Sequence, residues 1–296
     1  MYKALKIAVV GNPGSWSTEA LAQHIRRLTG SRLVVDLAKV IVDLQAGRAL
    51  YQGVDLCQYD ALIVKKVSRR YGSQMLDRVE MLRFIEACGV AVFSKPASLL
   101  RLLDRISCTL TLNAADIPMP PTVITEDVVG AVQTVKEYGC AVLKPLFSTK
   151  ARGMRKLSAE QPDLEQQVQA FSHANPVMYL QKFIDIPEQD LGVLFIGGEY
   201  IGAYARVKRS GAWSTSTVMG GSYAAHEPSA SLVDLARRAQ SLFDLDLTSV
   251  DLVQTAEGPL VFEVSAFGGF RGLKEAQGID VAGMYVQWVL RQLKSR

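Results

Sequence analysis

The sequence predicts an α/β protein in which a doubly wound parallel sheet precedes two lobes of mixed α+β structure. Three observations lead to this fold class. Between residues 5 and 93, short apolar segments alternate with segments of helical spacing, which is typical of βαβ units. Pro118, Pro120 and Pro121 then interrupt the chain and mark the entrance to a second lobe. The last third contains a glycine-pair hairpin signal and two strands that each carry an acid.

Four apolar segments are expected to form the strands of the first lobe: residues 5–10, 33–36, 61–64 and 90–93. Helical spacing occupies residues 19–28 and 77–88, and a helical or irregular segment is expected between the second and third strands. The first strand ends in a glycine-rich turn, residues 11–18, that lacks the Gly-Lys-Ser/Thr ending of a P-loop. Two interpretations stay open for this turn: its free amides bind an anion, or Ser17 or Thr18 caps the helix.

A basic loop, residues 65–72 (Lys-Lys-Val-Ser-Arg-Arg-Tyr-Gly), follows the strand at 61–64. Open α/β sheets bind ligands at the carboxyl ends of their strands. The loop therefore indicates an acidic substrate or a phosphate, and a solvated basic loop is the alternative for each single residue. We expect it to shape the substrate pocket together with residues 12–18.

The second lobe follows a helix at residues 98–114, which carries Asp104 and Arg105 on its polar side. Its elements are expected in the order strand, helix, strand, loop, helix and strand: residues 122–124, 127–138, 140–145, 146–154, 162–173 and 177–183. Lys144 closes an apolar strand, where an ammonium is costly unless it meets an anion such as a phosphate. The polar, basic loop that follows is of the kind that closes over phosphates.

The last lobe begins with a hairpin, residues 191–196 and 200–206, around a pair of glycines. The remaining elements are expected at residues 213–218 (strand), 231–245 (helix), 250–253 and 259–264 (strands) and 281–293 (helix). Asp251 and Glu263 each interrupt one of the paired strands between apolar neighbours, where a carboxylate needs a cation or hydrogen bonds to compensate it. The two carboxylates predict a Mg²⁺ site on a nucleotide's phosphates, and edge-strand acids facing water are the alternative.

Length and composition limit the classes of function. The chain's 296 residues are enough for two or three closely packed lobes. A formal net charge of +4 fits a local basic pocket better than a nucleic-acid-binding face, so no nucleic-acid partner is expected. Four scattered cysteines without a CxxC pair argue against structural zinc and disulfides and predict a cytoplasmic location. No segment has the length and character of a signal peptide or a membrane span.

The order of these features resembles the ATP-grasp superfamily, and within it the RimK-like and LysX-like carboxylate–amine ligases, over nearly the whole chain. The matching segments, in the family's order, are residues 104–105, 117–122, 142–145, 181–184, 195–199, 251–252 and 262–265. The resemblance implies an ATP-grasp fold with a pre-ATP-grasp substrate domain at residues 1–96 and an ATP-grasp domain at residues 97–296. Within the second domain it implies a mobile lid at about 117–184 and a metal-binding, catalytic part at about 185–296.

The resemblance implies an ATP-dependent ligase that joins a carboxylate to an amine through an acyl phosphate, with ATP and Mg²⁺ (or Mn²⁺) bound. Arg105 and Lys144 would contact the phosphates, and Arg206 with Lys144 would assist phosphoryl transfer. A hinge at residues 181–184 would hold the adenine, and Asp190 the ribose. The other implied residues are Ser148, Thr149, Arg152 and Gly153 in the phosphate loop from 148 to 153, the hinge residues Gln181, Lys182, Phe183 and Ile184, and the metal ligands Asp251, Glu263 and Ser265.

Some positions depart from the family's pattern. Ser265 stands where the family has Asn as the third metal ligand, and a neutral hydroxyl is a weaker ligand than the family's residue. Ser216 and Met219 stand where Asn and Arg are common, and Gly192 replaces an arginine that often follows the Asp after the hinge, here Asp190. The departures are compatible with ATP binding and put the family's ordinary substrate recognition in question.

Two other interpretations therefore stay open: an ATP-binding regulatory or scaffold protein without ligase activity, and a kinase-like transfer of phosphate to a hydroxyl. For the ligase, the expected partners are small acidic and amine substrates, such as an amino acid or a small acidic metabolite. A homodimer or homotetramer would be ordinary for this resemblance.

Overall fold

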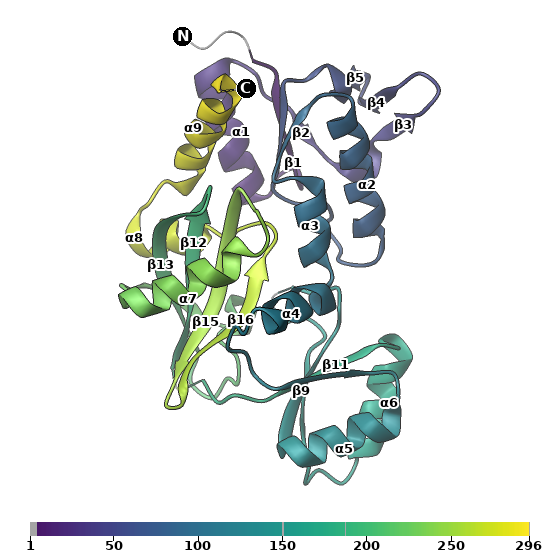
Figure 1. Cartoon of the computed structure of the whole chain (residues 1–296), viewed down its shortest axis with the longest axis vertical. Helices are drawn as coiled ribbons and strands as arrows, with labels where there is room; N and C mark the ends of the chain where they lie inside the picture. Colours follow the sequence, from purple (N-terminus) through teal and green to yellow (C-terminus); the bar gives the residue numbers. More distant parts are fainter. Residues whose placement is uncertain (1–4, 150, 187, 296) are drawn as a thin grey trace.

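The computed structural model describes residues 5–149, 151–186 and 188–295. Its strands form four sheets. Three of these sheets follow one another along the long axis of the molecule, and the sheet of the last third of the chain lies between the other two (Figure 1). Among the residues described, no helix has both the length and the apolar character needed to cross a membrane.

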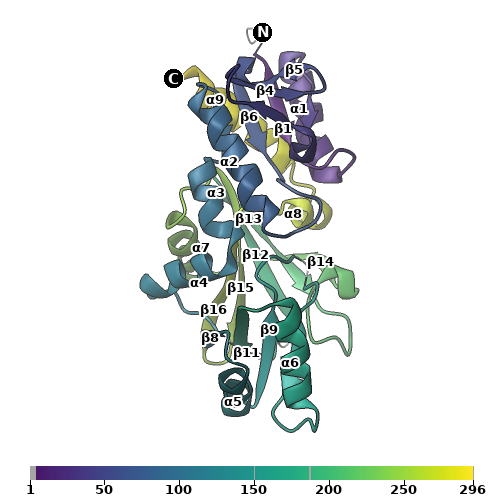
Figure 2. The same ribbon diagram turned by 90° about the vertical axis from the view of Figure 1, so that its right-hand side faces the viewer.

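The N-terminal sheet is parallel, with the strand order β2-β1-β6-β7. Its strands are β1 (Ile7–Val10), β2 (Val34–Val35), β6 (Ala61–Val64) and β7 (Ala91–Phe93). All residues of β1 and β6 are buried, and strands buried on both faces read as continuous apolar runs. Helix α1 (Trp16–Thr29) packs on β1 and on α9 (Val281–Lys294), and α2 (Gln74–Ala87) packs on β7. Figure 2 shows α9 returning to this lobe.

The expectation that Ser17 or Thr18 caps α1 is wrong, because the helix begins earlier, with Ser15 at the N-cap position. Thr18 is fully buried, and its hydroxyl accepts a hydrogen bond from the Ser15 hydroxyl at 2.7 Å. The Gly14 amide donates to the Glu19 carboxylate at 2.8 Å. That amide is one of those that an anion at this turn would need.

The chain between β2 and β6 forms a small antiparallel sheet, where the sequence predicts a helical or irregular segment. Its strands, in the order β3-β4-β5, are β3 (Ile41–Asp43), β4 (Arg48–Tyr51) and β5 (Val54–Asp55). The Asp43 carboxylate accepts a hydrogen bond from the Ala46 amide at 2.9 Å and closes the first turn. Gln52 and Gly53 both have positive φ at the second turn, 51° and 80°. Two-residue hairpins need this geometry, but glutamine is an uncommon choice for it, so the signal is weak.

The helix predicted at residues 98–114 is two helices, α3 (Pro96–Leu103) and α4 (Arg105–Ala114). Asp104 separates them, because its backbone is extended and its carboxylate accepts the Ile106 amide at 2.9 Å. A side chain in this N-cap role starts a new helix. Arg105 is therefore the first residue of α4 and lies at a helix N-terminus, not in the middle of a helix.

The sheet of the middle lobe is antiparallel, with the order β10-β9-β11-β8. Its elements are β8 (Thr122–Thr125), α5 (Val128–Tyr138), β9 (Cys140–Lys144), β10 (Arg155–Ser158), α6 (Leu164–Ala174) and β11 (Met178–Lys182). Leu143 and Leu180 share a core with α5 and α6. Because side chains alternate along a strand, Lys144 and Gln181 lie on the opposite face of this sheet.

The last sheet is antiparallel, with the order β14-β13-β12-β15-β16. Its strands are β12 (Gln189–Ile196), β13 (Glu199–Val207), β14 (Ser222–Ala225), β15 (Leu247–Thr255) and β16 (Gly258–Ser265). Helix α7 (Ala230–Ser241) packs on β15 and β16, and α8 (Arg271–Gln277) packs on β13 and β14. Val193 of β12 belongs to the core under α7, and Leu194 belongs to the core under α8 and α9. The two groups of helices therefore cover opposite faces.

The strand predicted at residues 213–218 is wrong, since the strand of this region is β14, after the paired glycines. The Gly221 amide donates to the Ser216 carbonyl at 3.2 Å. A Cβ at Gly221 would lie only 2.3 Å from the carbonyl oxygen of Thr215. The segment thus closes on itself instead of extending, and glycine permits the close approach.

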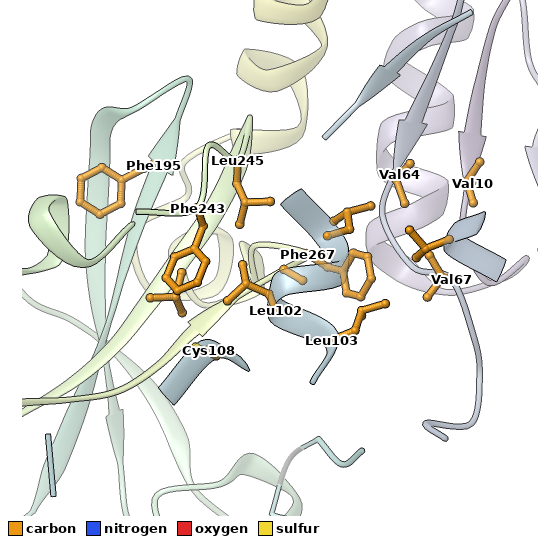
Figure 3. Close-up of a cluster of buried hydrophobic side chains, with 14 of the residues drawn as sticks. Val10, Val64, Val67, Leu102, Leu103, Cys108, Phe195, Phe243, Leu245 and Phe267 are labelled. Atoms are coloured by element: carbon orange, nitrogen blue, oxygen red, sulfur yellow. The ribbon is translucent and has the colours of Figure 1, made fainter. Parts of the chain in front are cut away.

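One hydrophobic core joins the N-terminal sheet to the last sheet (Figure 3). Val10 and Val64 contribute from the first, and Phe243 lies beside the second. Leu103 and Phe267 fill the space between them. Burial of this apolar surface fixes the position of the two sheets relative to each other.

A methyl group at Gly272 should destabilise the protein. A Cβ there would lie 2.3 Å from Cδ2 of Tyr204, whereas a Cβ at Gly269 would come no closer than 3.7 Å to that residue's hydroxyl. We expect Gly272→Ala to lower the free energy of unfolding by about 1–3 kcal/mol, because an overpacked ring must move. Urea unfolding measures the effect with Gly269→Ala as the matched control. Equal stability of the two variants would contradict the prediction.

Candidate functional site

The two acids of the last lobe lie opposite each other. Asp251 on β15 pairs with Glu263 on β16, and residues directly opposite in antiparallel strands present their side chains on one face. Asp190 on β12 pairs with Arg206 on β13, and Arg206 contacts Asp251. Three carboxylates and one arginine therefore share this face of the sheet.

A β-bulge at Phe262 adjusts the position of Glu263. Leu252 pairs with Val261 while Asp251 pairs with Glu263, so Phe262 is an extra residue without a partner on β15. Bulges bend a strand and redirect its side chains, and they are common beside active sites. In this case the Phe262 ring faces the Lys144 ammonium, and the Glu263 carboxylate faces the Arg105 guanidinium.

Arg206 bridges two carboxylates. Its Nε and Nη2 donate to Asp190 at 3.0 and 2.5 Å, and its Nη1 donates to Asp251 at 2.9 Å. The exposed fractions of the three side chains are 18% for Arg206, 7% for Asp190 and 20% for Asp251. Burial raises the pKa of Asp251 to about 6, and Arg206 opposes that rise. Both oxygens of Asp190 thus bind the guanidinium of Arg206, whereas the resemblance implies that Asp190 binds a ribose.

Lys144 ends β9 on the face away from the helices of its lobe. Its ammonium donates to Oε1 of Gln181 at 2.5 Å and lies 5.6 Å from the ring centre of Phe262. Burial and the positive charge of Arg105 lower the pKa of Lys144 to about 7, against the opposite effect of Glu263. An approaching anion would restore the proton to this lysine.

Arg105 connects the acids with the start of the phosphate loop. Its Nη1 lies 3.6 Å from Oε2 of Glu263, and its side chain is 10% exposed. Its Nε donates to the Pro145 carbonyl at 3.3 Å and its Nη2 to the Ser148 hydroxyl at 3.4 Å. The guanidinium therefore touches both the last lobe and the middle lobe.

The predicted phosphate loop is only partly at the site. Ser148 and Thr149 are half-buried, whereas Arg152 and Gly153 are exposed. The Arg152 amide donates to the Thr149 carbonyl at 3.3 Å. Lys150 lies outside the described residues. The structure thus brings Ser148 to Arg105 and leaves Arg152 facing solvent.

The predicted hinge lies at the end of β11. Gln181 is buried and holds the ammonium of the β9 lysine. The Lys182 amide donates to the Pro121 carbonyl at 2.8 Å, whereas within the described chain the Ile184 amide donates to no backbone carbonyl. The ring of Phe183 lies 3.6 Å from the ammonium of the β10 lysine. The Ile184 amide could therefore donate to an adenine without breaking a backbone hydrogen bond of the described chain, whereas the Lys182 amide would first have to leave the Pro121 carbonyl.

Ser265 ends β16 two residues after Glu263, and its carbonyl accepts the Thr248 hydroxyl at 2.8 Å. Across the described ranges, no three or more His, Cys, Asp or Glu side chains gather as a metal-binding group. A metal ion would therefore rely on the paired carboxylates and the serine. Mg²⁺ on nucleotide phosphates commonly takes one or two carboxylates and fills its shell with phosphate oxygens and water, so the residues fit this ion.

The expectation that the basic loop serves an acidic ligand is wrong for Lys65. Its side chain is buried, and its ammonium donates to the carbonyls of Phe267 and Gly268 and lies 4.6 Å from the ring centre of Phe270. Burial lowers the pKa of Lys65 well below its usual value. This lysine instead holds the loop that follows β16.

Sequence reasoning missed Tyr204, which lies beside Gly192. The two residues pair across β13 and β12, and a Cβ at Gly192 would lie 2.5 Å from the tyrosine ring. The Tyr204 hydroxyl donates to the Gly269 carbonyl at 3.2 Å. A signal was present, because Tyr204 stands two residues before Arg206 and so shares its face of the strand.

A groove of about 560 Å³ lies between α8 and the segment before β14. Its lining residues are Thr217, Val218, Gly221, Ser222, Tyr223, Arg271 and Glu275. Tyr223 pairs with Arg206 across β14 and β13. The groove therefore begins beside the arginine of the site. Within it Arg271 is paired with Glu275, and its Nε donates to the Glu275 carboxylate at 2.5 Å.

Comparison with protein families gives a match over most of the chain: a RimK-like ATP-grasp domain, at residues 103–289. Among curated proteins, a tetrahydromethanopterin:α-L-glutamate ligase of Methanosarcina acetivorans is 22% identical, and the match covers 97% of this chain and 98% of that protein. A ribosomal protein bS6–L-glutamate ligase of Salmonella schwarzengrund is 26% identical over 97% of this chain and 96% of its own length.

Solved structures share the whole fold. The ATP-grasp ligase PsnB, complexed with a phosphomimetic variant of minimal precursor, Mg and ADP, has a TM-score of 0.75 at 20% identity, over 98% of this chain and 99% of that chain. A RimK domain protein from Sphaerobacter thermophilus has a TM-score of 0.73 at 20% identity, over 96% of this chain and 99% of its own. The D-cycloserine synthetase DcsG has a TM-score of 0.72 at 18% identity, over 97% and 99%.

Affinity for ADP should fall as the pH rises above about 7, the pKa of Lys144. Below this pH the lysine already carries the charge that a phosphate needs, whereas above it binding must first take up a proton. Lys144→Arg keeps its charge throughout this range, so its affinity should be nearly independent of pH. Calorimetric titration with ADP measures both affinity and proton uptake.

The control for this experiment is Lys136→Arg, which changes an exposed lysine in the last turn of α5 and should keep the wild-type profile. If Lys144→Arg also kept the wild-type dependence on pH, the titrating group would be another residue.

Proposed function

The chain belongs to the family of proteins with a RimK-like ATP-grasp domain, and we propose that it is an ATP-dependent ligase for a carboxylate and an amine. ATP, when bound, supplies the γ-phosphoryl group that activates the carboxylate as an acyl phosphate. The amine displaces phosphate and loses a proton, so the products are an amide, ADP and inorganic phosphate. Charge neutralisation and positioning carry most of the catalysis in phosphoryl transfer, and the protein's side chains supply both.

One observation carries the proposal: the pair of Asp251 and Glu263 is surrounded by cations from three other elements. Arg206 comes from β13, Arg105 from α4 and Lys144 from β9. A structural core seldom gathers five charged side chains. A magnesium–nucleotide complex requires both signs of charge, since the acids hold the metal and the cations hold the phosphates.

The proposed contacts of the nucleotide follow from the positions of these residues. Lys144 and Arg105 bind phosphates, and the short distance between Arg105 and Ser148 supports a phosphate contact for the start of the loop. The amide of Ile184, which donates to no backbone carbonyl of the described residues, supports its role in binding adenine. The remaining proposed contacts are Thr149, Arg152 and Gly153 with the phosphates, Gln181, Lys182 and Phe183 at the adenine, and Asp251, Glu263 and Ser265 at Mg²⁺ or Mn²⁺.

We assign Arg206 to the charge that develops on the transferred phosphoryl group. Asp190 anchors the guanidinium with two hydrogen bonds, which leaves Nη1 directed toward Asp251 and the site. A bidentate anchor of this kind fixes the plane of an arginine. Asp190 is therefore proposed first as the anchor of Arg206 and only second as a ribose contact.

The proposed substrates are a small acid and an amine, with an amino acid as one partner. Two relatives are named as glutamate ligases, which supports an amino acid. Because Gly192 replaces the arginine common in the family, a different cation must recognise the acidic group. Arg271 in the groove beside Tyr223 is the proposed one, and it would exchange its contact with Glu275 for the acidic group of the substrate.

We propose the domain division, location and assembly on the same basis. Residues 1–96 form the substrate domain, residues 97–296 the ATP-grasp domain, with the lid at 117–184 and the catalytic part at 185–296. The separate sheets of these segments support this division. A cytoplasmic location agrees with four free cysteines among the described residues, and a homo-oligomer agrees with the family.

Glu263→Gln should abolish ligation, because it removes one of the two paired carboxylates. We expect the rate of ADP release with a panel of carboxylates and amines to fall at least about 100-fold, with folding preserved. Glu257→Gln is the matched control, since Glu257 is an exposed acid in the turn between the same two strands. Wild-type rates in Glu263→Gln would refute the site, and wild-type protein that binds ADP without any turnover would instead be a scaffold.

Ser265→Asn should reduce the magnesium concentration that gives half-maximal ADP release. An amide oxygen is a stronger ligand than a hydroxyl and reaches further from the strand. Ser265→Ala should shift the same midpoint in the opposite direction, because it removes the third oxygen. Magnesium titrations at saturating ATP measure both shifts. If both variants had the wild-type midpoint, Ser265 would not be a ligand.

A further inference from the structure

Tyr179 lies on β11 directly opposite Lys144 of β9, and it is buried, with 2% of its surface exposed. Residues directly opposite each other in antiparallel strands present their side chains on one face of the sheet. Tyr179 therefore shares the face of the proposed phosphate lysine, away from α5 and α6. A buried tyrosine hydroxyl requires hydrogen-bond partners, and those of Tyr179 come from two different parts of the chain.

The first partner is the side-chain amide of Gln181, whose Nε2 donates to the Tyr179 hydroxyl at 3.3 Å and to the Thr122 hydroxyl at 3.0 Å. The Thr122 hydroxyl itself donates to the Pro120 carbonyl at 2.8 Å, so it can only accept from the amide. This fixes the orientation of the amide and turns its oxygen toward the ammonium of Lys144. Both amide protons are used, so the side chain holds the lysine and has no proton left to donate to an adenine.

The second partner is Thr109 of α4, since the hydroxyls of Thr109 and Tyr179 share a hydrogen bond of 2.9 Å. Thr109 stands four residues after Arg105 in this helix, so the two side chains lie on the same face. The guanidinium carbon of Arg105 lies 5.8 Å from the centre of the Tyr179 ring, within the range of a cation–π interaction. Helix α4 packs on β16 and, in Figure 1, lies above the sheet of β9 and β11. Tyr179 therefore contacts this helix through its hydroxyl and the arginine through its ring.

Lys144 and Arg105 require such a connection because they carry like charges. After burial, the charge of Arg105 is the main cause of the lowered pKa of Lys144, so the two groups are close enough to repel each other. Glu263 attracts Arg105 at 3.6 Å, whereas Lys144 is held by a neutral amide. A neutral hydrogen bond fixes a charged group without neutralising it, which leaves the charge of the lysine available to a phosphate.

We propose that Tyr179 is a positioning residue that sets the spacing between Lys144 and Arg105. It binds the helix of the arginine through Thr109 and the lysine through Gln181, so one side chain of β11 aligns two cations that come from α4 and β9. This role rests on the proposed function, in which both cations bind the phosphates of the nucleotide. It adds Tyr179 and Thr109 to the site as residues that act through the cations.

Calorimetric titrations with ADP and with adenosine test the proposal, because only ADP carries phosphates. Tyr179→Phe removes the hydroxyl and keeps the ring, and Thr109→Val removes the partner hydroxyl with nearly the same shape. Each variant should bind ADP about three- to tenfold more weakly than the wild type, as expected for one lost hydrogen bond, and should bind adenosine equally well. Thr109→Ser keeps a hydroxyl and should bind ADP nearly as the wild type does.

The matched control is Tyr138→Phe, since Tyr138 ends α5 in the same lobe and packs against the core on the other face of the sheet. This variant should leave both affinities unchanged. The Thr109→Val/Tyr179→Phe double variant should bind ADP no more weakly than Tyr179→Phe alone, because both changes break the same hydrogen bond.

Wild-type affinity for ADP in both Tyr179→Phe and Thr109→Val would overturn the proposal. So would an equal loss of affinity for adenosine, or a Thr109→Ser variant as weak as Thr109→Val, since the effect would then not pass through the hydroxyl to the phosphates. A wild-type protein that binds ADP no better than adenosine would exclude the phosphate site and this role together. If Tyr179→Phe weakened ADP binding in a protein without turnover on any substrates, the role of Tyr179 would be supported and the ligase excluded.

Discussion

The candidate site depends on the way in which Arg206 is held by Asp190 and Asp251 together. Removing one partner from a pair with so little exposure leaves an uncompensated charge and costs about 3–5 kcal/mol. This constraint keeps β12, β13 and β15 in register at the level of the site, since each strand contributes one member. Glu263 on β16 is approached from the other side by Arg105. The arginines therefore keep the acids close to one another before any metal is bound.

Most elements could be predicted because their signals are local. The apolar runs of β1 and β6, the glycine-pair hairpin and the last helix agree with the structure within about two residues, and the order of motifs led to the family that residues 103–289 match. The misses depend on tertiary contacts. The bulge at Phe262 is defined by the register with the partner strand β15. The break at Asp104 depends on its carboxylate, which accepts the Ile106 amide and caps a new helix. The loop around Gly221 depends on a close approach to Thr215.

The paired acids were visible in the sequence because carboxylates are rare between apolar strand residues. For Tyr204 the sequence shows only that it shares a strand face with Arg206, because its packing between two glycines depends on the tertiary structure. A Cβ at Gly192 or at Gly272 would strike the same ring. The two glycines, on separate elements, form a slot for Tyr204, whose hydroxyl holds Gly269. The ring of Tyr204 thus occupies the space that a side chain at Gly192 would need.

Lys65 sets a limit on how this chain could exchange parts with its relatives. It belongs to the first lobe, yet its buried ammonium is the donor for the carbonyls of Phe267 and Gly268, just beyond the strand of Glu263. A fragment cut to the matched segment, residues 103–289, would lack this donor. The first lobe is therefore not an independent module, and a recombined chain with a foreign first lobe would need another donor for the loop after β16.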